Sequence, residues 1–237
     1  MNLYAYVKNN PLIHVDPSGH IPTALEAAIM ADHIYSAEKG REYTLSGGWT
    51  FEDLITGGDN MKMGVYSRVK SNGKTEYSLV NKGTSPTSLN DWKNNVQQLF
   101  GSSDDMKASI EKSKEFVKSN SNNEITMIGH SKGGAEAAAN AVATNKNSFI
   151  FNPATVNLKA YGLNSSNYRA SMTAFIVKGD ALNGAEGWFS KPIDKAVYLP
   201  QQYGGGWRNL WQTSMYDNIR NHSMGAVMDA LKEAGYK

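Results

Sequence analysis

A serine flanked by glycines stands where a buried strand gives way to an Ala-rich helix. The pentapeptide 129–133 is GHSKG, with the apolar run 125–128 before it and the alanines of 135–143 after it. Between a strand and a helix, G-x-S-x-G forms a nucleophile elbow, whose strained turn exposes the serine Oγ and whose glycines allow close packing. The N-terminus of the helix adds partial positive charge where an oxyanion would form. We therefore predict Ser131 as the nucleophile of an acyl transfer, and an ordinary tight turn is the alternative.

A nucleophilic serine needs a general base, and histidine is the usual one. In this type of site the serine, the acid and the histidine follow one another along the chain. Of the five histidines, His222 is the one that follows Ser131. The other four are His14, His20, His33 and His130. His130 is adjacent to the serine, but the turn should direct its side chain away from Oγ. We predict His222 as the base, with a capping or surface histidine as the alternative.

An acidic residue should lie between the nucleophile and the base, where it would orient the imidazole and stabilise the imidazolium. The carboxylates in that interval are Glu136, Asp180, Glu186, Asp194 and Asp217. Asp180 follows the apolar strand 173–177 and Gly179, at the carboxyl edge where such sheets keep their sites. Glu136 lies on the elbow helix, where we expect its side chain to point away. We predict Asp180 as the acid and rank Asp194 next; a turn or capping residue is the alternative for Asp180.

The oxyanion of an acyl transfer needs two hydrogen-bond donors. The first should be the backbone N–H of Lys132, the residue after the nucleophile. The second should come from the loop 81–84, with the sequence NKGT, which follows an earlier strand. In this loop Thr84 could offer both its N–H and its hydroxyl. The end of a plain hairpin is the alternative for the loop.

The spacing of apolar residues predicts the elements that would position these groups. Helical spacing predicts helices, and short apolar or alternating runs predict strands, with a hairpin turn at 71–74. The expected helices are 22–38, 88–100, 104–118, 132–143 and 222–234, and the expected strands are 63–69, 77–81, 124–128, 149–151 and 174–178. Strands and helices alternate in the second half of the chain. We therefore predict an α/β fold, the α/β-hydrolase fold, with a mainly parallel sheet and helices on both faces.

Composition narrows the classes of protein and of site. The 237 residues suffice for one domain, the net charge is +2, and no basic block suggests a nucleic-acid partner. The absence of cysteine excludes thiol chemistry and Cys-based zinc sites. The paired carboxylates Asp104 and Asp105 at a helix start are explained by capping and the helix dipole, so we expect neither a metal nor a cofactor. We find no signal peptide and no apolar run long enough for a transmembrane helix.

Several of these motifs occur together in a fixed order along the chain. They are Lys82-Gly83-Thr84 with Asp91-Trp92, the elbow 129–134 (GHSKGG), the segment 177–180 (VKGD) and His222. This set resembles the class 3 lipase family, and the Ser-Lys-Gly-Gly form is similar to a bacterial branch of that superfamily. The resemblance covers about residues 25 to 234. It implies an esterase of acyl lipids with Thr84 and Lys132 as oxyanion donors, although family members often have Arg where Lys82 stands.

The first twenty residues carry a second resemblance. Residues 2–11 are NLYAYVKNNP and residues 16–19 are DPSG, two turn signals around a short apolar stretch. This junction is similar to the end of the core repeat in bacterial RHS proteins, where a variable C-terminal toxin follows and a cognate immunity protein neutralises it. It implies a division into residues 1–20, the end of the repeat or a linker, and residues 21–237, the lipase-like domain. An ordinary linker is the alternative.

Together these patterns predict a serine esterase of lipids, in particular a phospholipase toxin delivered into target cells as part of a larger RHS protein. Its expected partners are a phospholipid substrate, an immunity protein and a membrane surface. The aromatic residues within 188–211 could contact that surface, form an acyl pocket or belong to the ordinary core. Two other functions stay open: a carboxylesterase or amidase acting on a soluble substrate, and an inactive hydrolase fold that binds a partner. Lys82 and Lys132 could select an anionic head group or be ordinary solvated lysines.

Overall fold

The described part of the chain forms one sheet of eight strands, arranged side by side in the order of the sequence. A computed structural model describes residues 22–58, 60–84, 103–182, 195–204 and 215–236. The strands are β1 (Tyr43–Thr44), β2 (Thr50–Gly57), β3 (Met61–Val69), β4 (Thr75–Asn81), β5 (Glu124–His130), β6 (Asn147–Phe151), β7 (Met172–Val177) and β8 (Lys195–Leu199). The segment 1–20 and the predicted helix 88–100 lie outside the described residues.

The strand direction changes at β4. Neighbouring strands are antiparallel from β1 to β4 and parallel from β4 to β8. The predicted hairpin joins β3 to β4, and the N–H of Lys70 donates to the carbonyl of Lys74 across its turn. The four parallel pairings confirm the predicted α/β fold with a mainly parallel sheet.

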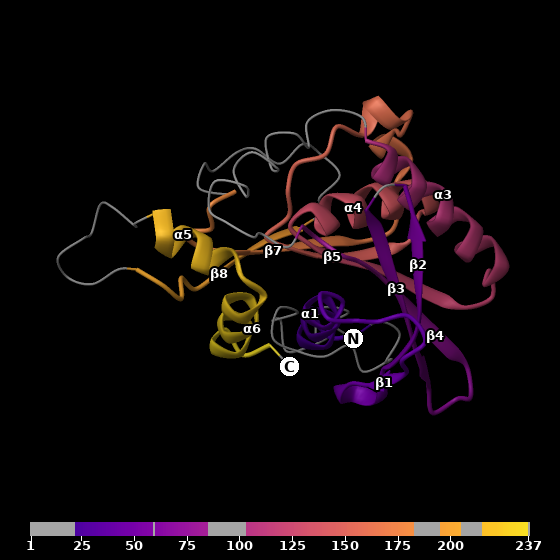
Figure 1. Ribbon diagram of the computed structural model, residues 1–237, viewed down its shortest axis with the longest axis horizontal. Helices are drawn as coiled ribbons and strands as arrows, with labels where there is room; N and C mark the ends of the chain where they lie inside the picture. Colours follow the sequence, from indigo (N-terminus) through magenta and orange to yellow (C-terminus); the bar gives the residue numbers. More distant parts are fainter. Residues whose placement is uncertain (1–21, 59, 85–102, 183–194, 205–214, 237) are drawn as a thin grey trace, which may run out of the picture.

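Helices cover both faces of this sheet (Figure 1). They are α1 (Ala24–His33), α3 (Asp104–Ser119), α4 (Lys132–Thr144), α5 (Met215–His222) and α6 (Met224–Glu233), with 3₁₀ turns at η2 (Ser46–Gly48), η4 (Leu158–Tyr161) and η5 (Ser165–Asn167). The helices α3 and α4 pack together on one face, and α1 and α6 pack together on the other. Right-handed crossovers that advance in one direction along a sheet place their helices on the same face. The helices α1 and α6, near the two ends of the chain, cover the opposite face.

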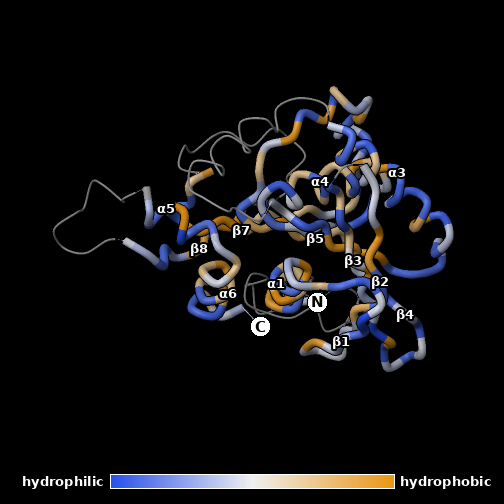
Figure 2. Tube along the Cα trace, in the orientation of Figure 1, coloured by the Kyte–Doolittle hydropathy of each residue, from blue (hydrophilic) through white to orange (hydrophobic). Residues whose placement is uncertain are grey.

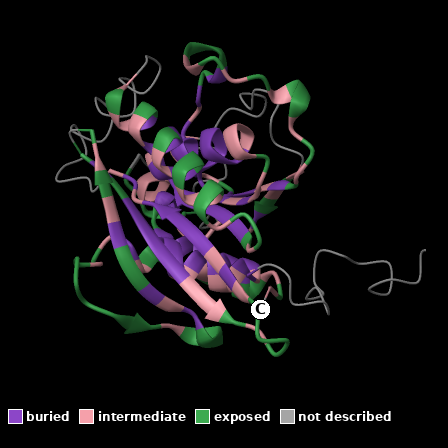
Figure 3. Cartoon of the chain, turned by 90° about the vertical axis from the view of Figure 1, so that its right-hand side faces the viewer, coloured by how far each residue is buried: buried purple, intermediate pink, exposed green. Residues whose placement is uncertain are grey.

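Alternate side chains of the central strands fill two hydrophobic layers. In β5, Met127 packs with the residues of α3 and α4, whereas Ile128 packs with those of α1 and α6. In β7, Ile176 and Val177 divide in the same way. Figure 2 shows apolar strands at the centre of the molecule and a hydrophilic outer surface on α3, and Figure 3 shows that the central strands are mostly buried. Because both faces of these strands are covered, their sequences are apolar almost throughout.

Local capping signals set the helix starts. The helix α1 begins after Thr23, which forms a capping box with Glu26. The helix α6 begins after Ser223, whose hydroxyl accepts a hydrogen bond from the first turn. The N-cap of α3 is Ser103, so Asp104 lies in the first turn and is not the cap.

Strand β2 was not predicted, and a β-bulge explains why. The pairing of β2 with β3 shifts register between Phe51 and Asp53. As a result the buried residues Phe51 and Leu54 are three positions apart, whereas a regular strand would place them two apart. The bulge therefore removes the alternation by which a sequence indicates a strand. The short strands β1 and β8 were missed as well.

The C-terminal helices differ from the prediction of a single helix over 222–234. The polar helix α5 precedes α6, and His222 is its last residue. His222 therefore lies at the junction of two helices and not at the start of the last one. At the other end of the domain, α1 ends at His33, well before the predicted end at residue 38.

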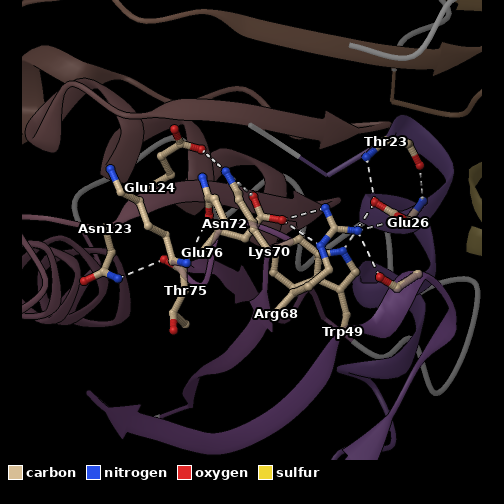
Figure 4. Close-up of polar contacts among 12 residues, drawn as sticks. Thr23, Glu26, Trp49, Arg68, Lys70, Asn72, Thr75, Glu76, Asn123 and Glu124 are labelled. Atoms are coloured by element: carbon tan, nitrogen blue, oxygen red, sulfur yellow. Dashed lines mark hydrogen bonds and ion pairs between the residues drawn. The ribbon is translucent and has the colours of Figure 1, made fainter. Parts of the chain in front are cut away.

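Charged residues gather at the amino ends of β4 and β5 (Figure 4). This ion cluster consists of Glu26, Arg68, Lys70, Glu76 and Glu124. The guanidinium of Arg68 lies 2.9 Å from Glu26 Oε1 and 2.6 Å from Glu76 Oε1. The ammonium of Lys70 lies 3.2 Å from Glu76 and 2.5 Å from Glu124. The cluster thus joins α1, β3, β4 and the start of β5, at the ends of these two parallel strands that are farthest from Ser131.

Candidate active site

The turn between β5 and α4 has the strained geometry of a nucleophile elbow. Ser131 has φ 57° and ψ −125°, and a positive φ is uncommon for a residue other than glycine. The flanking glycines are needed because backbone atoms occupy the space of a side chain. A Cβ on Gly129 would lie 2.1 Å from the carbonyl oxygen of Gly133, and one on Gly133 would lie 2.2 Å from that of Asn81. The serine conformation therefore depends on both glycines of the motif.

Backbone hydrogen bonds tie this elbow to the neighbouring strand. The N–H of Ser131 donates to the carbonyl of Phe151 at 3.1 Å, and the N–H of Ala154 donates to the carbonyl of Ser131 at 3.0 Å. Lys132 is the first residue of α4, so its N–H has no acceptor within the helix. This N–H lies at the helix N-terminus beside Ser131, the position expected of the first oxyanion donor.

Asp180 and His222 are in direct contact. The Oδ2 atom of Asp180 lies 2.5 Å from Nδ1 of His222, and Oδ1 accepts a hydrogen bond from the N–H of Leu182. The turn that carries Asp180 away from β7 contains Gly179, which has φ 78°. Both side chains of the pair are buried. A carboxylate at Nδ1 holds the proton on that nitrogen and leaves Nε2 as the basic one.

His130 connects this pair to the elbow. Its Nε2 atom lies 2.6 Å from the carbonyl oxygen of His222, and the centroids of the two imidazole rings are 4.7 Å apart. Since His130 directly precedes Ser131, the contact brings His222 to the end of β5. The structure thus gathers Ser131, Asp180 and His222 at the carboxyl edge of the parallel strands.

Two asparagines that the sequence analysis missed hold the segment around His222. The Nδ2 atom of Asn152 donates to the carbonyls of Asn221 and His222, at 3.0 and 3.3 Å, and its Oδ1 accepts from the N–H of Val177. The Oδ1 atom of Asn221 accepts from the N–H of Tyr203, and its Nδ2 donates to the carbonyl of the same residue. Asn152 directly follows a buried strand, and a polar residue at that place was the available signal.

The predicted oxyanion loop lies against the elbow. A Cβ on Gly83 would lie 2.6 Å from the carbonyl oxygen of His130, next to Ser131, so glycine allows this close approach. The ammonium of Lys82 donates to the carbonyl of Tyr35 at 3.1 Å, so this lysine anchors the loop to the segment that follows α1. Thr84 follows Gly83 and is half-buried. The loop is therefore placed where Thr84 could reach an oxyanion formed at Ser131.

The side chain of Lys132 is held by two carboxylates. Its ammonium lies 2.6 Å from Asp105 and 3.6 Å from Glu136. Burial opposes the charged ammonium, but Glu136 and Asp105 outweigh it and raise the pKa of Lys132. Burial raises the pKa of Glu136 to about 7, against the opposing effects of Lys132 and the Asn81 amide. Lys132 is therefore not a solvated lysine, and its charge is already compensated.

The remaining candidates that the structure describes are Glu136, Asp217 and His33. Glu136 on α4 contacts Lys132, and Asp217 lies in the first turn of α5. His33 pairs with the hydroxyl of Tyr66, 2.9 Å from its Nδ1. Those outside the described residues are His14, His20, Glu186 and Asp194. Within the described ranges, no three acidic or histidine side chains converge as a metal site requires.

A comparison of sequences assigns the chain to a family. The profile of a phospholipase-like family, the Tle-like phospholipase domain, matches residues 26–187, which is more than half of the chain. The chain belongs to this family. The Tle-like domain is thus a lipase-like α/β-hydrolase whose class of substrate is a lipid ester. The matched region includes Thr84, Ser131, Lys132 and Asp180, and it ends before His222.

Solved structures share the fold of this Tle-like domain. A triacylglycerol lipase from Penicillium expansum matches with a TM-score of 0.50 and 14% identity, over 74% of this chain and 77% of that one. A mono- and diacylglycerol lipase from Aspergillus oryzae has a TM-score of 0.39 and 16% identity, over 69% and 71% of the two chains. A CIB-like hydrolase from Thermoplasma acidophilum has a TM-score of 0.39 and 17% identity, over 78% and 100%. The first match confirms the predicted α/β-hydrolase fold.

Two further findings concern curated relatives and the helices of the structure. No curated protein matches the sequence of this Tle-like domain. Among the helices of the described residues, none combines the length and the apolar character needed to cross a bilayer.

Proposed function

We propose that the domain is a serine esterase with Ser131 as nucleophile, His222 as general base and Asp180 as the residue that orients the base. The observation that supports this most strongly is the contact of Asp180 with Nδ1 of His222, in a pair held beside the strained elbow. The oxyanion donors are the backbone N–H of Lys132 and the N–H and hydroxyl of Thr84. This arrangement also favours an active enzyme over an inactive fold that only binds a partner.

The proposed reaction proceeds through an acyl-enzyme. Nε2 of His222 takes the proton of Ser131 as Oγ attacks the acyl carbonyl, and the oxyanion accepts hydrogen bonds from Lys132 and Thr84. The imidazolium then gives its proton to the leaving alcohol, and the acyl group remains on Oγ. Water then loses a proton to His222 as it attacks the acyl-enzyme, and the imidazolium returns that proton to Oγ of Ser131 as the fatty acid leaves. Asp180 stays ionised and stabilises the imidazolium throughout.

We propose a phospholipid as the substrate. The support is the match to a phospholipase-like family, together with the resemblance of the motifs to class 3 lipases. A phospholipase must reach the membrane surface, so we expect peripheral contact there, with the aromatic residues of 188–211 as the candidates. These residues lie outside the described ranges. A carboxylesterase or amidase of soluble substrates is the competing enzyme.

We also propose that this domain is the toxic end of an RHS protein. The support is the sequence of residues 2–19, which resembles the end of the RHS core repeat and stands directly before the lipase-like domain that we place at 21–237. Membrane phospholipid is an ester whose hydrolysis harms any cell. Delivery into target cells as part of the larger protein, and neutralisation by a cognate immunity protein, would follow from this arrangement.

The deciding experiment compares the wild type with Ser131→Ala. We expect the variant to lose roughly 10⁶-fold in kcat on a short p-nitrophenyl ester, as triad nucleophiles do. A fluorophosphonate probe should label the wild type and not the variant. Equal turnover by the two proteins would refute the assignment of Ser131, and a folded wild type that takes up no probe would favour the inactive fold.

The substrate and the biological role are tested together in a sensitive bacterium. Wild-type protein directed to the membrane compartment should lower viability and release free fatty acid or lysophospholipid, identified by mass spectrometry. Ser131→Ala and His222→Ala should be harmless at equal expression. Killing by both variants would contradict a catalytic toxin, and a harmless wild type with good esterase activity would favour the soluble-substrate enzyme.

A further inference from the structure

A chain of two hydrogen bonds runs from Tyr35, which lies against the oxyanion loop, to the backbone of His222. The phenolic oxygen of Tyr35, just after α1, lies 2.8 Å from Nδ1 of His130. The same phenol lies against Gly83 of the oxyanion loop, where a Cβ would lie 2.3 Å from its oxygen. On the other side of the imidazole, Nε2 of His130 lies 2.6 Å from the carbonyl oxygen of His222. None of these contacts takes part in the proposed proton transfer. They connect the residue before Ser131, the nucleophile, to His222, the proposed base.

The donors of this chain all point in one direction. A carbonyl oxygen can only accept, so Nε2 of His130 must carry the proton. Nδ1 is then an acceptor for the O–H of Tyr35. Burial and the nearby His222 ring lower the pKa of His130 to about 3. The imidazole of His130 therefore stays neutral near neutral pH and keeps one donor and one acceptor.

The carbonyl at the end of the chain belongs to the residue that we propose as general base. His222 ends α5, and α6 begins two residues later, so its position depends on contacts with other elements. The contact from His130, at 2.6 Å, is shorter than that from Asn152, at 3.3 Å. Proton transfer requires the base within hydrogen-bond reach of the nucleophile, and small displacements lower the rate steeply. Holding the backbone of His222 therefore holds its Nε2.

We propose that Tyr35 and His130 are positioning residues for His222, a role that rests on the proposed serine-esterase function. Neither side chain needs to touch the substrate. His130 holds the carbonyl of His222, and Tyr35 keeps the proton of His130 on Nε2 so that this bond can form. Loss of the Tyr35 hydroxyl should therefore lower kcat and leave KM almost unchanged, because substrate contacts are retained.

A double-mutant cycle with Tyr35→Phe and His130→Gln tests this role. A glutamine amide always carries donor hydrogens, so in His130→Gln the bond to His222 no longer needs a tyrosine to set a tautomer. We expect Tyr35→Phe to lower kcat on a short p-nitrophenyl ester about tenfold in the wild-type background, and less than about twofold in the His130→Gln background. KM should stay within about twofold in both. An equal loss in both backgrounds, or no loss in the single variant, would overturn the proposal.

Tyr66→Phe is the matched control. The hydroxyl of Tyr66 also bonds to a histidine, 2.9 Å from Nδ1 of His33, but this pair belongs to β3 and α1. Both phenylalanine variants should lose similar thermal stability, and Tyr66→Phe should keep kcat within about twofold of the wild type. If His130→Gln does not fold, this comparison decides, because an equal fall of kcat in both phenylalanine variants would reduce Tyr35 to a structural role. An inactive wild type would instead contradict the proposed function itself.

Discussion

The two ends of β4 and β5 are held by different kinds of contact. At the amino ends, the ion cluster joins α1, β3 and the two strands through charged pairs (Figure 4). At the carboxyl ends, the contacts that hold the backbone of His222 come from neutral groups: the amide of Asn152 and the imidazole of His130, which the phenol of Tyr35 contacts in turn. The carboxylate of Asp180 is the charge that faces the histidine there.

This difference reflects what each end has to do. Removing one partner of a buried ion pair leaves a charge without compensation, so we expect the loss of a single member of the ion cluster to lower stability. Near a general base, a further permanent charge would shift the pKa of the base, whereas neutral hydrogen bonds fix its position without that effect. The charge of Lys132, which directly follows Ser131, is compensated by Asp105 and Glu136. We therefore expect substitutions at the carboxyl end to change the rate and those at the amino end to change stability.

Of the substitutions at the two ends, Asp180→Asn should have the largest effect, a loss of kcat. An asparagine at this place favours the wrong imidazole tautomer of His222, so we expect kcat to fall on the order of 10⁴-fold with little change in stability. Steady-state kinetics on a short ester and a urea titration measure the two quantities. Asp194→Asn is the control, because Asp194 is the carboxylate that the sequence ranked next. If Asp194→Asn were the inactive variant, Asp194 would be the acid.

Thr84→Val tests the neutral contacts at the same end. If the hydroxyl of Thr84 donates to the oxyanion, its removal should lower kcat about 10²- to 10³-fold. Thr84→Ser keeps the hydroxyl and should retain most of the rate, so the pair separates the hydroxyl from the fold of the loop. A change below about threefold in Thr84→Val would leave only the backbone of this residue as a donor.

Arg68→Met tests the opposite end. It leaves the carboxylates of Glu26 and Glu76 without this partner, so the free energy of unfolding should fall by about 3 kcal/mol, while kcat stays within about twofold. The control is Arg41→Met, which breaks a pair with Glu38 whose side chains are 78% and 64% exposed. That change should cost less than about 1 kcal/mol. A large loss of kcat in folded Arg68→Met would show that the two ends are not independent.

The smallest expected effect is on the pH dependence of stability and comes from Glu136. This carboxylate is buried near the carboxyl ends of the strands, where the contacts around His222 are otherwise mostly neutral. Its pKa is raised from 4.5 to about 7, so the stability contributed by the neutral carboxyl is complete below 4.5 and is lost as pH rises through 7. Between pH 5 and 8 the wild type should lose about 2–3 kcal/mol more unfolding free energy than Glu136→Gln. Urea titrations at the two pH values measure this difference. Parallel pH dependences would contradict the raised pKa.

The elements that the sequence predicted well are those whose signals are local. Strand β5, the elbow and α4 were predicted within two residues, since a strand buried on both faces is apolar and the motif needs both of its glycines. The strand β2 was missed because its bulge breaks the alternation. The polar helix α5 carries no comparable pattern, and a short edge strand such as β8 gives a weak one.

The sequence by itself determined the place of Ser131 and the order in which its partners must follow. Those features depend on neighbouring residues, because the φ of Ser131 and the packing of Gly129 against Gly133 are decided within one turn. Only the tertiary structure decided which carboxylate meets His222, as Asp180 is 42 residues away from it in the chain. It also decided that Tyr35, 95 residues before His130, would bond to that histidine, because such contacts depend on strand order and helix packing and not on local sequence.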